Sequence, residues 1–396
     1  MAQSNKVLNI EELQREQRDR LEGERRSRGR KRRMSGLMKL VILVLVVLLL
    51  IGAIDYISHY DLSTRVGNAF VSFGGPGYPV PVPGGLIRDV QAIGPNLAVL
   101  NDTNLHIYNR GGRQVANIQH LTERSAALTS RDRALVYDFG GRRVSLHSLG
   151  RELHVHTIED MVLGAALGEG GEYAIITSPR NFIAQVEVFN SRSQSMMTWG
   201  SRQHVRGAAI SPRGDMLVAD CVDSFGGVLG TELVFLRFDR EEELLRVRLE
   251  GELVVWMSFI SYNRIAVLTD RAYRVFDNQG RAVGVYAFAE GEPLMAFQSG
   301  GERMLLLCGA RESHDRELVL LDSTARRAAS VTVQGRVLDI ALGSRNIWLL
   351  TDSALIRYNI ALENPETLES AGMQRIKYVD GRLYYFTRYE IRILEA

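Results

Sequence analysis

Residues 264–283 read RIAVLTDRAYRVFDNQGRAV, and they hold the pattern from which the fold follows. Two apolar runs flank the polar pair Thr269-Asp270, and a turn containing Asp277 and Gly280 comes next. Residues 96–115 (NLAVLNDTNLHIYNRGGRQV) and 346–359 (NIWLLTDSALIRYN) repeat this order. Short apolar runs bounded by turn residues are typical of β-strands.

Weaker copies become visible when the turn that opens each second strand is aligned. The first apolar residues after this turn are separated by 36 to 48 residues, with a mean near 41. They are Leu97, Ala134, Ala174, Leu217, Ile265, Met304, Ile347 and Leu383. A period of about 40–45 residues with four strands per unit is the signature of a propeller blade. The sequence therefore predicts an all-β fold, a β-propeller of eight blades, with seven blades as the alternative if one weak unit is miscounted.

The last unit supplies only three strands, over residues 374–379, 382–387 and 390–394, before the sequence ends. An open sheet edge invites aggregation, so a fourth strand is expected from another part of the chain. We predict that Val66–Phe73 supplies this strand and closes the ring by pairing with the last blade.

An apolar run, LMKLVILVLVVLLLIGAI, occupies residues 37–54 and holds one charge, Lys39. At about 1.5 Å per residue it nearly crosses a hydrocarbon core about 30 Å thick. It is longer than the apolar part of a cleaved signal peptide, and Ile51-Gly52-Ala53 is a poor cleavage site. The sequence predicts an uncleaved transmembrane signal-anchor helix over residues 37–57.

Basic residues surround the start of this run. The residues that we expect to determine the topology are Arg25, Arg26, Arg28, Arg30, Lys31, Arg32, Arg33 and Lys39. Because basic residues stay on the cytoplasmic side, the N-terminus is expected inside and the propeller outside. The predicted organisation is a cytoplasmic basic tail (1–36), the anchor (37–57), a Pro/Gly-rich linker with the ring-closing strand (58–85) and an extracytoplasmic propeller (86–396), in a single-pass protein of the cell membrane.

Charge and cysteine content limit the partners of the outer domain. The whole chain carries +2, and residues 1–39 hold twelve basic and six acidic side chains, so the remainder carries −4. This balance argues against a nucleic-acid partner. Cys221 and Cys308 occupy equivalent strand positions two units apart, beyond the roughly 7 Å limit between Cα atoms for a disulfide. Both are therefore expected to be small buried apolar residues.

The order of basic tail, anchor, Pro/Gly linker and degenerate propeller resembles an uncharacterised family of single-pass membrane-anchored β-propeller proteins of clostridial Gram-positive bacteria. In architecture the repeats are similar to WD40-like and quinoprotein-like propellers. They lack the Gly-His and Trp-Asp marks of WD40 repeats, and Trp199, Trp256 and Trp348 sit at different positions in their units. The resemblance covers the full length but rests on layout, so it implies no functional residues.

No catalytic motif is found: the nucleophile elbow, the H-E-x-x-H helix, the P-loop and the dinucleotide fingerprint do not occur. His154 and His156 share one strand face, but two ligands make a weak metal signal. Four carboxylates recur near the turn between the second and third strands of their units, where Asp commonly caps its own turn. They are Asp102, Asp138, Asp270 and Asp352. We expect a protein that is not an enzyme and that has no catalytic residues, no metal and no cofactor.

Two units have an enlarged hairpin between their second and third strands, at residues 221–231 and 309–316. Insertions in repeats map to loops on one face, which is often the binding face. The binding residues predicted from these hairpins are Asp223, Phe225, Arg311, Glu312, His314 and Asp315. Phe225 is expected on a flexible loop. The structural alternative is a long hairpin without a partner.

These features favour a non-catalytic binding or scaffold module that is tethered to the membrane and holds an envelope protein or a cell-wall component. One alternative is an envelope glycan hydrolase or lyase with its site in the propeller funnel. Another alternative is a transmembrane sensor. The layout decides between these classes only weakly, because a propeller fold by itself implies no ligand.

Overall fold

The computed structural model describes residues 67–68, 71, 73–120, 124–240, 242–310, 314–370 and 372–394. The predicted tail and anchor, residues 1–57, lie outside this range. Within it, no helix is both long and apolar enough to cross a membrane. The described chain forms 32 strands in eight antiparallel four-stranded sheets, which confirms the all-β fold and the count of eight blades.

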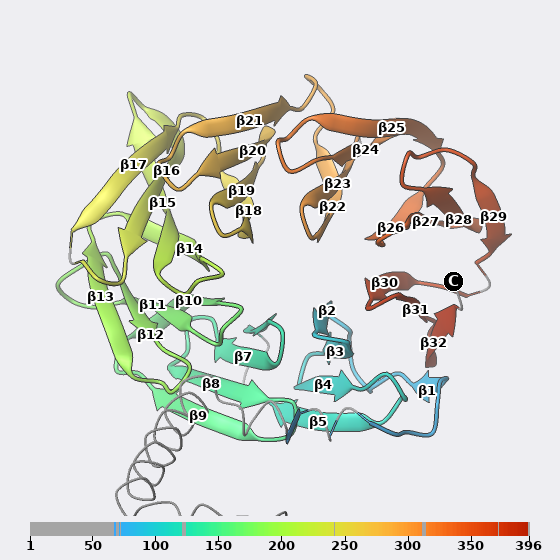
Figure 1. Cartoon of the computed structure of the whole chain (residues 1–396), viewed down its shortest axis with the longest axis horizontal. Helices are drawn as coiled ribbons and strands as arrows, with labels where there is room; N and C mark the ends of the chain where they lie inside the picture. The colour runs from blue at the N-terminus through green and yellow to red at the C-terminus, as the bar shows by residue number, and fades with distance from the viewer. Residues whose placement is uncertain are drawn as a thin grey trace, which may run out of the picture. The chain divides into compact units, whose positions relative to one another are not determined.

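Each blade contains strands a to d in order, with strand a innermost and strand d outermost (Figure 1). Blade 1 consists of β2 (Asp89–Ile93), β3 (Asn96–Leu100), β4 (Asn104–Tyr108) and β5 (Gln114–Gln119), and blade 2 of β6 (Ser125–Thr129), β7 (Arg133–Asp138), β8 (Arg143–Ser148) and β9 (Glu152–Thr157). Blade 3 consists of β10 (Met161–Leu167), β11 (Tyr173–Ser178), β12 (Ala184–Phe189) and β13 (Ser195–Ser201), and blade 4 of β14 (His204–Ile210), β15 (Met216–Phe225), β16 (Val228–Arg237) and β17 (Glu243–Leu249). Blade 5 consists of β18 (Val254–Ser261), β19 (Arg264–Thr269), β20 (Ala272–Asp277) and β21 (Ala282–Ala287), and blade 6 of β22 (Leu294–Gly300), β23 (Arg303–Cys308), β24 (Asp315–Leu321) and β25 (Arg327–Gln334). Blade 7 consists of β26 (Val337–Leu342), β27 (Asn346–Thr351), β28 (Ala354–Asn359) and β29 (Glu366–Glu369), and blade 8 of β30 (Arg375–Val379), β31 (Arg382–Phe386), β32 (Glu390–Leu394) and β1 (Val80–Pro81).

The apolar runs that revealed the repeat are the second strands of the blades. All eight aligned positions, from Leu97 to Leu383, lie on a strand b. In β3 every residue is buried, and in β19, β23 and β27 every residue after the first is buried. A strand covered on both faces needs an unbroken apolar run, whereas an outer strand such as β21 alternates between half-buried and exposed residues. The difference between the two patterns therefore reflects position within the blade.

The hydrophobic core is divided into eight clusters, and each cluster lies between two neighbouring blades. The cluster between blades 7 and 8, for example, joins Trp348 and Leu350 of β27 to Leu383 of β31. No blade has a core of its own, so the face of a blade is buried only when its neighbour is present. The stability of the ring depends on eight contacts of one kind.

The turns between strands c and d of blades 1, 3, 5, 6 and 7 share one hydrogen-bond pattern. The side-chain oxygen of Asp277 accepts the backbone N–H groups of Gln279 and Arg281, both at 2.9 Å. The same pattern, in which a side-chain oxygen accepts the backbone N–H groups two and four residues later in the chain, occurs at Asn109, Asn190, Asp322 and Asn359. Asn and Asp supply this contact because their side chains are short enough to bond to the backbone of their own turn.

Ring closure differs from the prediction. The fourth strand of blade 8 is β1, which pairs Val80 with Ile391 and Pro81 with Glu390, so Val66–Phe73 was the wrong segment. Alternating Pro and Val residues suit an outer strand rather than a central one, because one edge of an outer strand has no partner. Val80 is buried, and the Tyr78 ring packs edge-on against Tyr384 with ring centres 5.4 Å apart.

The N-terminal part of the described chain lies on one face of the ring. Asn109 and Arg113, in the c–d turn of blade 1, donate hydrogen bonds to the Val71 carbonyl, and the Leu149 N–H of blade 2 donates to Asn68 Oδ1 at 3.2 Å. We call the side with the a–b and c–d turns the linker face. The opposite side, with the b–c turns and the connections from each strand d to the next strand a, is the b–c face.

Removing β1 should destabilise the ring. A chain that begins at residue 83 lacks Tyr78 and Val80, and we expect its Tm to fall by roughly 5–10 °C because two buried side chains are lost. Thermal unfolding followed by circular dichroism measures this change, and a chain beginning at residue 67 is the control. If both chains melt at the same temperature and remain monomeric, β1 does not close the ring in solution.

Candidate functional site

The enlarged hairpin of blade 4 is ordered rather than flexible. Strands β15 and β16 each span ten residues and pair up to Phe225 and Val228. Only Gly226 and Gly227 remain in the turn, with φ values of 58° and 90° that suit glycine and the right-handed twist of a hairpin. Phe225 therefore lies on a strand, and its expected place on a flexible loop was wrong.

A polar network holds the base of this hairpin. The Asp223 carboxylate accepts hydrogen bonds from the Gln203 side chain at 2.6 Å and from the Ser224 N–H at 2.7 Å. These two bonds lower the pKa of Asp223, that from Ser224 being the larger cause. The guanidinium of Arg248 lies 5.5 Å from the centre of the Phe225 ring. Two of the predicted binding residues are thus held in fixed positions by neighbours.

Glu232 is the centre of the same network and is almost fully buried. Its carboxylate accepts bonds from Arg246 at 2.5 Å and from Arg248 at 3.1 Å. Burial would raise the pKa of this carboxyl, but the hydrogen bonds from Arg246, Gln203 and Arg248 hold it below its usual range. Glu232 is therefore ionised at neutral pH and acts as a structural anchor for the hairpin.

The predicted residues of blade 6 do not join those of blade 4. His314 and Asp315 are exposed where β24 begins, whereas Arg311 and Glu312 lie outside the described residues. Blade 5 lies between the two hairpins in the ring (Figure 1). The six residues thus share the b–c face only as two separate groups, and their role in binding stays a prediction.

Exposed apolar side chains are concentrated on the b–c face. Seventeen large apolar residues are exposed in the described chain, and eleven of them lie in b–c turns, at the beginning of a strand a, or in the connection before it. They are Leu86, Phe139, Met161, Phe182, Ile183, Val228, Leu229, Val255, Met295, Leu338 and Tyr389. Every blade contributes at least one. Exposed apolar groups that gather on one face mark an interaction surface, whereas scattered ones need no explanation.

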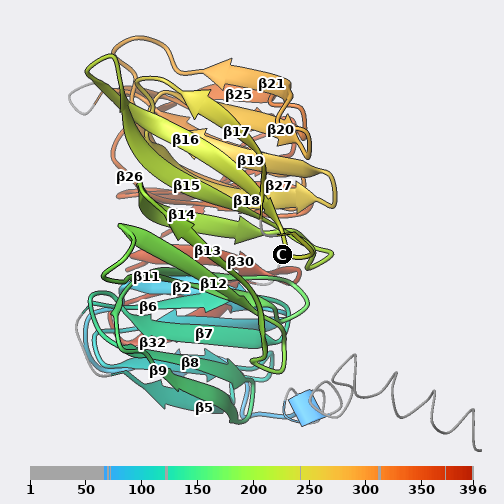
Figure 2. The same ribbon diagram turned by 90° about the vertical axis from the view of Figure 1, so that its left-hand side faces the viewer.

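The remaining exposed apolar residues are distributed differently. Four lie on outer strands: Val155, Met196, Val283 and Val285. Phe73 and Tyr262 are the two on the linker side. In the edge-on view of Figure 2, the N-terminal end of the described chain lies at the right of the ring and the tip of the β15–β16 hairpin at the upper left. The apolar b–c face is therefore not covered by the described linker.

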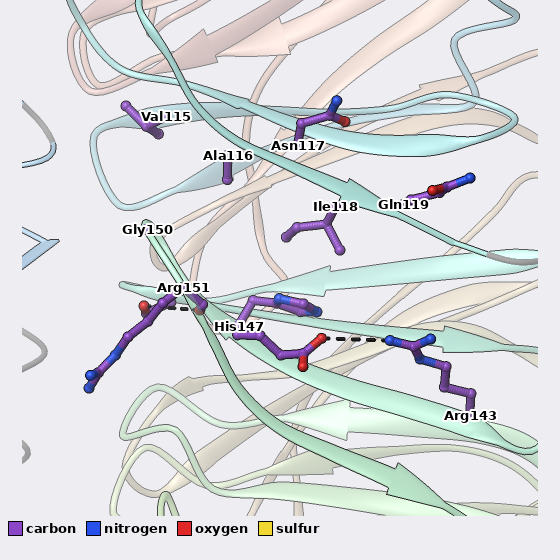
Figure 3. A pocket seen from close by; sticks show the side chains of 11 residues that line it. Val115, Ala116, Asn117, Ile118, Gln119, Arg143, His147, Gly150 and Arg151 are labelled. Carbon is purple, nitrogen blue, oxygen red and sulfur yellow. Dashed lines mark hydrogen bonds and ion pairs between the residues drawn. The ribbon is translucent and has the colours of Figure 1, made fainter.

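A pocket of about 590 Å³ lies between the outer parts of blades 1 and 2 (Figure 3). One wall is formed by Ala116 and Ile118 of β5, and the other by Arg143, His147 and Glu152 of blade 2. Arg143 and Glu152 form an ion pair across 3.6 Å. Burial lowers the pKa of His147 to about 4, so its imidazole is neutral at pH 7 and is hydrogen-bonded to Ser145 at 2.8 Å. The pocket offers polar contacts, and the Ser145 hydroxyl that His147 contacts is buried and is not part of its lining.

Polar groups on the innermost strands are used to join blades. Lys377 Nζ of blade 8 donates to Gln298 Oε1 of blade 6 at 3.2 Å, and Asp339 of blade 7 accepts the Ile376 N–H at 2.9 Å. Burial lowers the pKa of Lys377 and raises that of Asp339. These groups tie three blades together on the inner side of the ring, which explains their burial without a ligand.

The other groups weighed from the sequence do not assemble into a site. Asp102, Asp138, Asp270 and Asp352 belong to blades 1, 2, 5 and 7. His156 contacts the Tyr173 hydroxyl and packs against Phe189. In the described part of the chain, no three His, Cys, Asp or Glu residues gather closely enough to hold a metal ion. Cys221 and Cys308 are buried and unpaired, as predicted, and burial raises the pKa of both thiols to about 12.

The fold defines an eight-bladed β-propeller, and comparison of the sequence with known families gives the family. A family described as a family of unknown function (DUF5711) matches residues 88–364, and the chain belongs to it. The predicted resemblance is thereby confirmed at the level of an uncharacterised propeller family, whereas the membrane anchor and the clostridial relationship stay predictions. No curated protein matches the sequence.

Solved structures show the same fold at low identity. A crystal structure of the eukaryotic initiation factor matches with a TM-score of 0.52 and 10% identity, over 81% of this chain and 85% of that chain. BamB from Moraxella catarrhalis matches with a TM-score of 0.48 and 10% identity, over 80% and 100%. Hsv2p of Kluyveromyces lactis matches with a TM-score of 0.45 and 12% identity, over 63% and 85%. At these identities the likeness concerns the fold alone.

Asp220 on β15 allows a test of the electrostatics beside the b–c face. It is 3% exposed, and burial raises the pKa of its carboxyl to about 6, although Arg206 opposes this. Because the pKa in the unfolded chain is about 3.9, stability falls as the pH rises from about 4 to 6. Asp220→Asn should therefore raise the free energy of unfolding by about 1–3 kcal/mol at pH 7.5 and leave it unchanged at pH 3.5.

Urea unfolding at the two pH values measures this difference. Asp352→Asn, at an exposed position, is the control and should change neither value. If Asp220→Asn raised the free energy of unfolding as much at pH 3.5 as at pH 7.5, packing and not the buried charge would be responsible.

Proposed function

We propose that this protein is a membrane-tethered, non-catalytic scaffold whose propeller holds a partner protein of the cell envelope on the b–c face. The observation that carries this proposal is the concentration of exposed apolar side chains on that face, with contributions from all eight blades. Burial of apolar surface is the main driving force of protein association, so such a face gains most from a protein partner.

The order of the chain supports the tether. The apolar run at residues 37–54 precedes the propeller, and Asn68 and Gly74 contact turns of the linker face. A tether attached on that side leaves the opposite b–c face free of the chain's own linker. The basic residues before the run favour a cytoplasmic N-terminus and an extracytoplasmic propeller.

A catalytic role has less support. General acid–base chemistry on a glycan needs two carboxyl groups about 5–10 Å apart at one site. The four recurring carboxylates belong to separate blades, and on the innermost strands Lys377 and Asp339 are used in contacts between blades. The pocket between blades 1 and 2 contains one carboxylate, Glu152, and it faces Arg143. A glycan enzyme is therefore the weaker alternative.

The tip of the blade 4 hairpin provides the test of the binding face. Val228 and Leu229 are 54% and 53% exposed, and the double variant V228S/L229S removes two apolar groups without disturbing a core. We expect it to recover at least tenfold less partner than the native chain in cross-linked pull-downs from envelopes, because about 2–4 kcal/mol of apolar burial is lost. V283S/V285S on β21 is the matched control.

Equal recovery by both double variants would place the contact elsewhere. Circular dichroism spectra and Tm values of both variants should equal those of the native chain, since all four side chains are exposed. If wall fragments rather than a protein were recovered, the glycan alternative would replace the scaffold.

The tether is tested separately. A chain from which residues 1–57 are removed should be released from the membrane fraction, because the apolar run supplies the anchor. The full chain should remain in the membrane fraction after washing with alkaline carbonate, which removes peripheral proteins. Release of the full chain by this wash would rule out a spanning anchor.

A further inference from the structure

A β-bulge recurs at the same place in five consecutive blades. In β10, β14, β18, β22 and β26 the pairing with strand b skips one residue close to the b–c end of the innermost strand. The inserted residues are Leu163, Arg206, Val255, Met295 and Leu338. Strands β2, β6 and β30 pair without a shift. The ring is therefore asymmetric, with a bulged arc over blades 3 to 7.

The bulges turn apolar side chains toward solvent. A bulge places two residues opposite one and redirects a side chain, and it is common beside functional sites. Val255, Met295 and Leu338 are 51%, 40% and 39% exposed although they belong to the innermost strands. Arg316 Nε lies 3.3 Å from Met295 Sδ and holds that side chain in place. Leu163 differs, because it is half-buried and packs against the cluster between blades 3 and 4. Val255, Met295 and Leu338 belong to none of the described core clusters, so core packing does not explain an apolar residue at these three positions.

Arg206 is the one charged member of the arc. It is exposed and forms no ion pair in the described chain, although it acts on the carboxyl of the buried Asp220, where burial raises the pKa and Arg206 opposes the rise. A single guanidinium beside three exposed apolar side chains does not suit a phosphate backbone or anionic lipid, since both require several basic residues. It suits a protein segment that presents one carboxylate among apolar side chains.

The shape of the arc favours an extended segment. The five bulged strands follow one another around the centre of the ring (Figure 1), so a ligand that contacts them must curve. A short helix is straight, whereas an extended chain bends readily and places alternate side chains on one face.

The hairpin of blade 4 adds a backbone edge next to this arc. β14 pairs with β15 only as far as His204 and Val222, and β17 pairs with β16 only as far as Leu249 and Thr231. Residues 223–225 of β15 continue beyond the strand that would cover their inner edge. In the described chain no strand pairs with this edge. The Ser224 N–H is already donated to the Asp223 carboxylate, so the edge offers a carbonyl oxygen that can accept a hydrogen bond from the backbone N–H of an extended segment.

We infer that the exposed bulge residues Arg206, Val255, Met295 and Leu338 bind an extended segment of the partner protein in which apolar residues alternate and one acidic residue faces Arg206. This inference rests on the proposed scaffold function and names the site and the partner's chemistry. The segment crosses the arc, its carboxylate pairs with the guanidinium of Arg206, and its backbone runs along the edge of β15 at residues 223–225.

Photo-cross-linking of the full chain in native envelopes tests the site. Benzoylphenylalanine is placed at Met295 or at Leu338, and at Val285 on an outer strand as the matched control. The expected result is that both arc positions, and not the control, cross-link to one segment of a single protein. Mass spectrometry of the adduct should show alternating apolar residues with an Asp or Glu among them.

Charge reversal tests the pairing. Arg206→Glu should reduce recovery of the partner at least tenfold, since a charge-assisted bond contributes about 1.5–3 kcal/mol. Exchange of the partner's acidic residue for Arg should restore recovery by the Arg206→Glu chain. A synthetic peptide of the cross-linked segment should compete with the partner for the native chain.

The contrary outcomes are distinct. Lipid adducts, a segment with helical periodicity, or the absence of adducts at both arc positions would overturn the inference. If V228S/L229S recovered less partner than the native chain in such a case, the scaffold function would stand and only the arc would be excluded as the binding site. If V228S/L229S instead recovered as much partner as the native chain, the proposed function would fail as well.

Discussion

A blade with two apolar faces cannot be stable alone, and this constraint governs the whole propeller. The second strands are buried from both sides, and each of the eight core clusters belongs to a pair of neighbouring blades. The ring must therefore close. β1 performs this closure by pairing N-terminal residues with β32, so that the cluster between blades 8 and 1 includes Val80 beside Val99 and Tyr384.

Closure has a consequence for binding. Packing buries the inner and lateral surfaces of the blades. The turns and the strand ends at the two faces therefore remain available for recognition. The linker occupies turns of one face, at Asn109 and Leu149, and the other face carries most of the exposed apolar groups. A rigid ring can present such groups with little loss of conformational entropy on binding, which favours affinity. The paired hairpin of blade 4 is an example of this rigidity.

Particular residues show which parts of the structure could be predicted from the sequence. The aligned positions such as Leu97 and Ile265 all fall on second strands, since burial on both faces demands an apolar run that is visible without a structure. The prediction of an enlarged hairpin in blade 4 was also correct. The closing strand was misplaced because two paired residues, one of them Pro81, leave almost no periodic signal. The exposed apolar side chains of the b–c face were missed because Met295 and Leu338, at the beginning of apolar strands, read as core residues.

The sequence alone determined the repeat, the order of the strands within it and the location of the long hairpin, because these depend on local periodicity and on turn residues such as Asp277. Tertiary structure alone decided which segment closes the ring, which apolar residues remain exposed and which charged groups meet. Gln203 reaches Asp223, and Arg248 lies over Phe225, across distances in sequence that no local pattern records. A bulge shifts the register by one residue and moves a side chain from one environment to another. The sequence shows an apolar residue there, and only the pairing of the strands shows that it faces solvent.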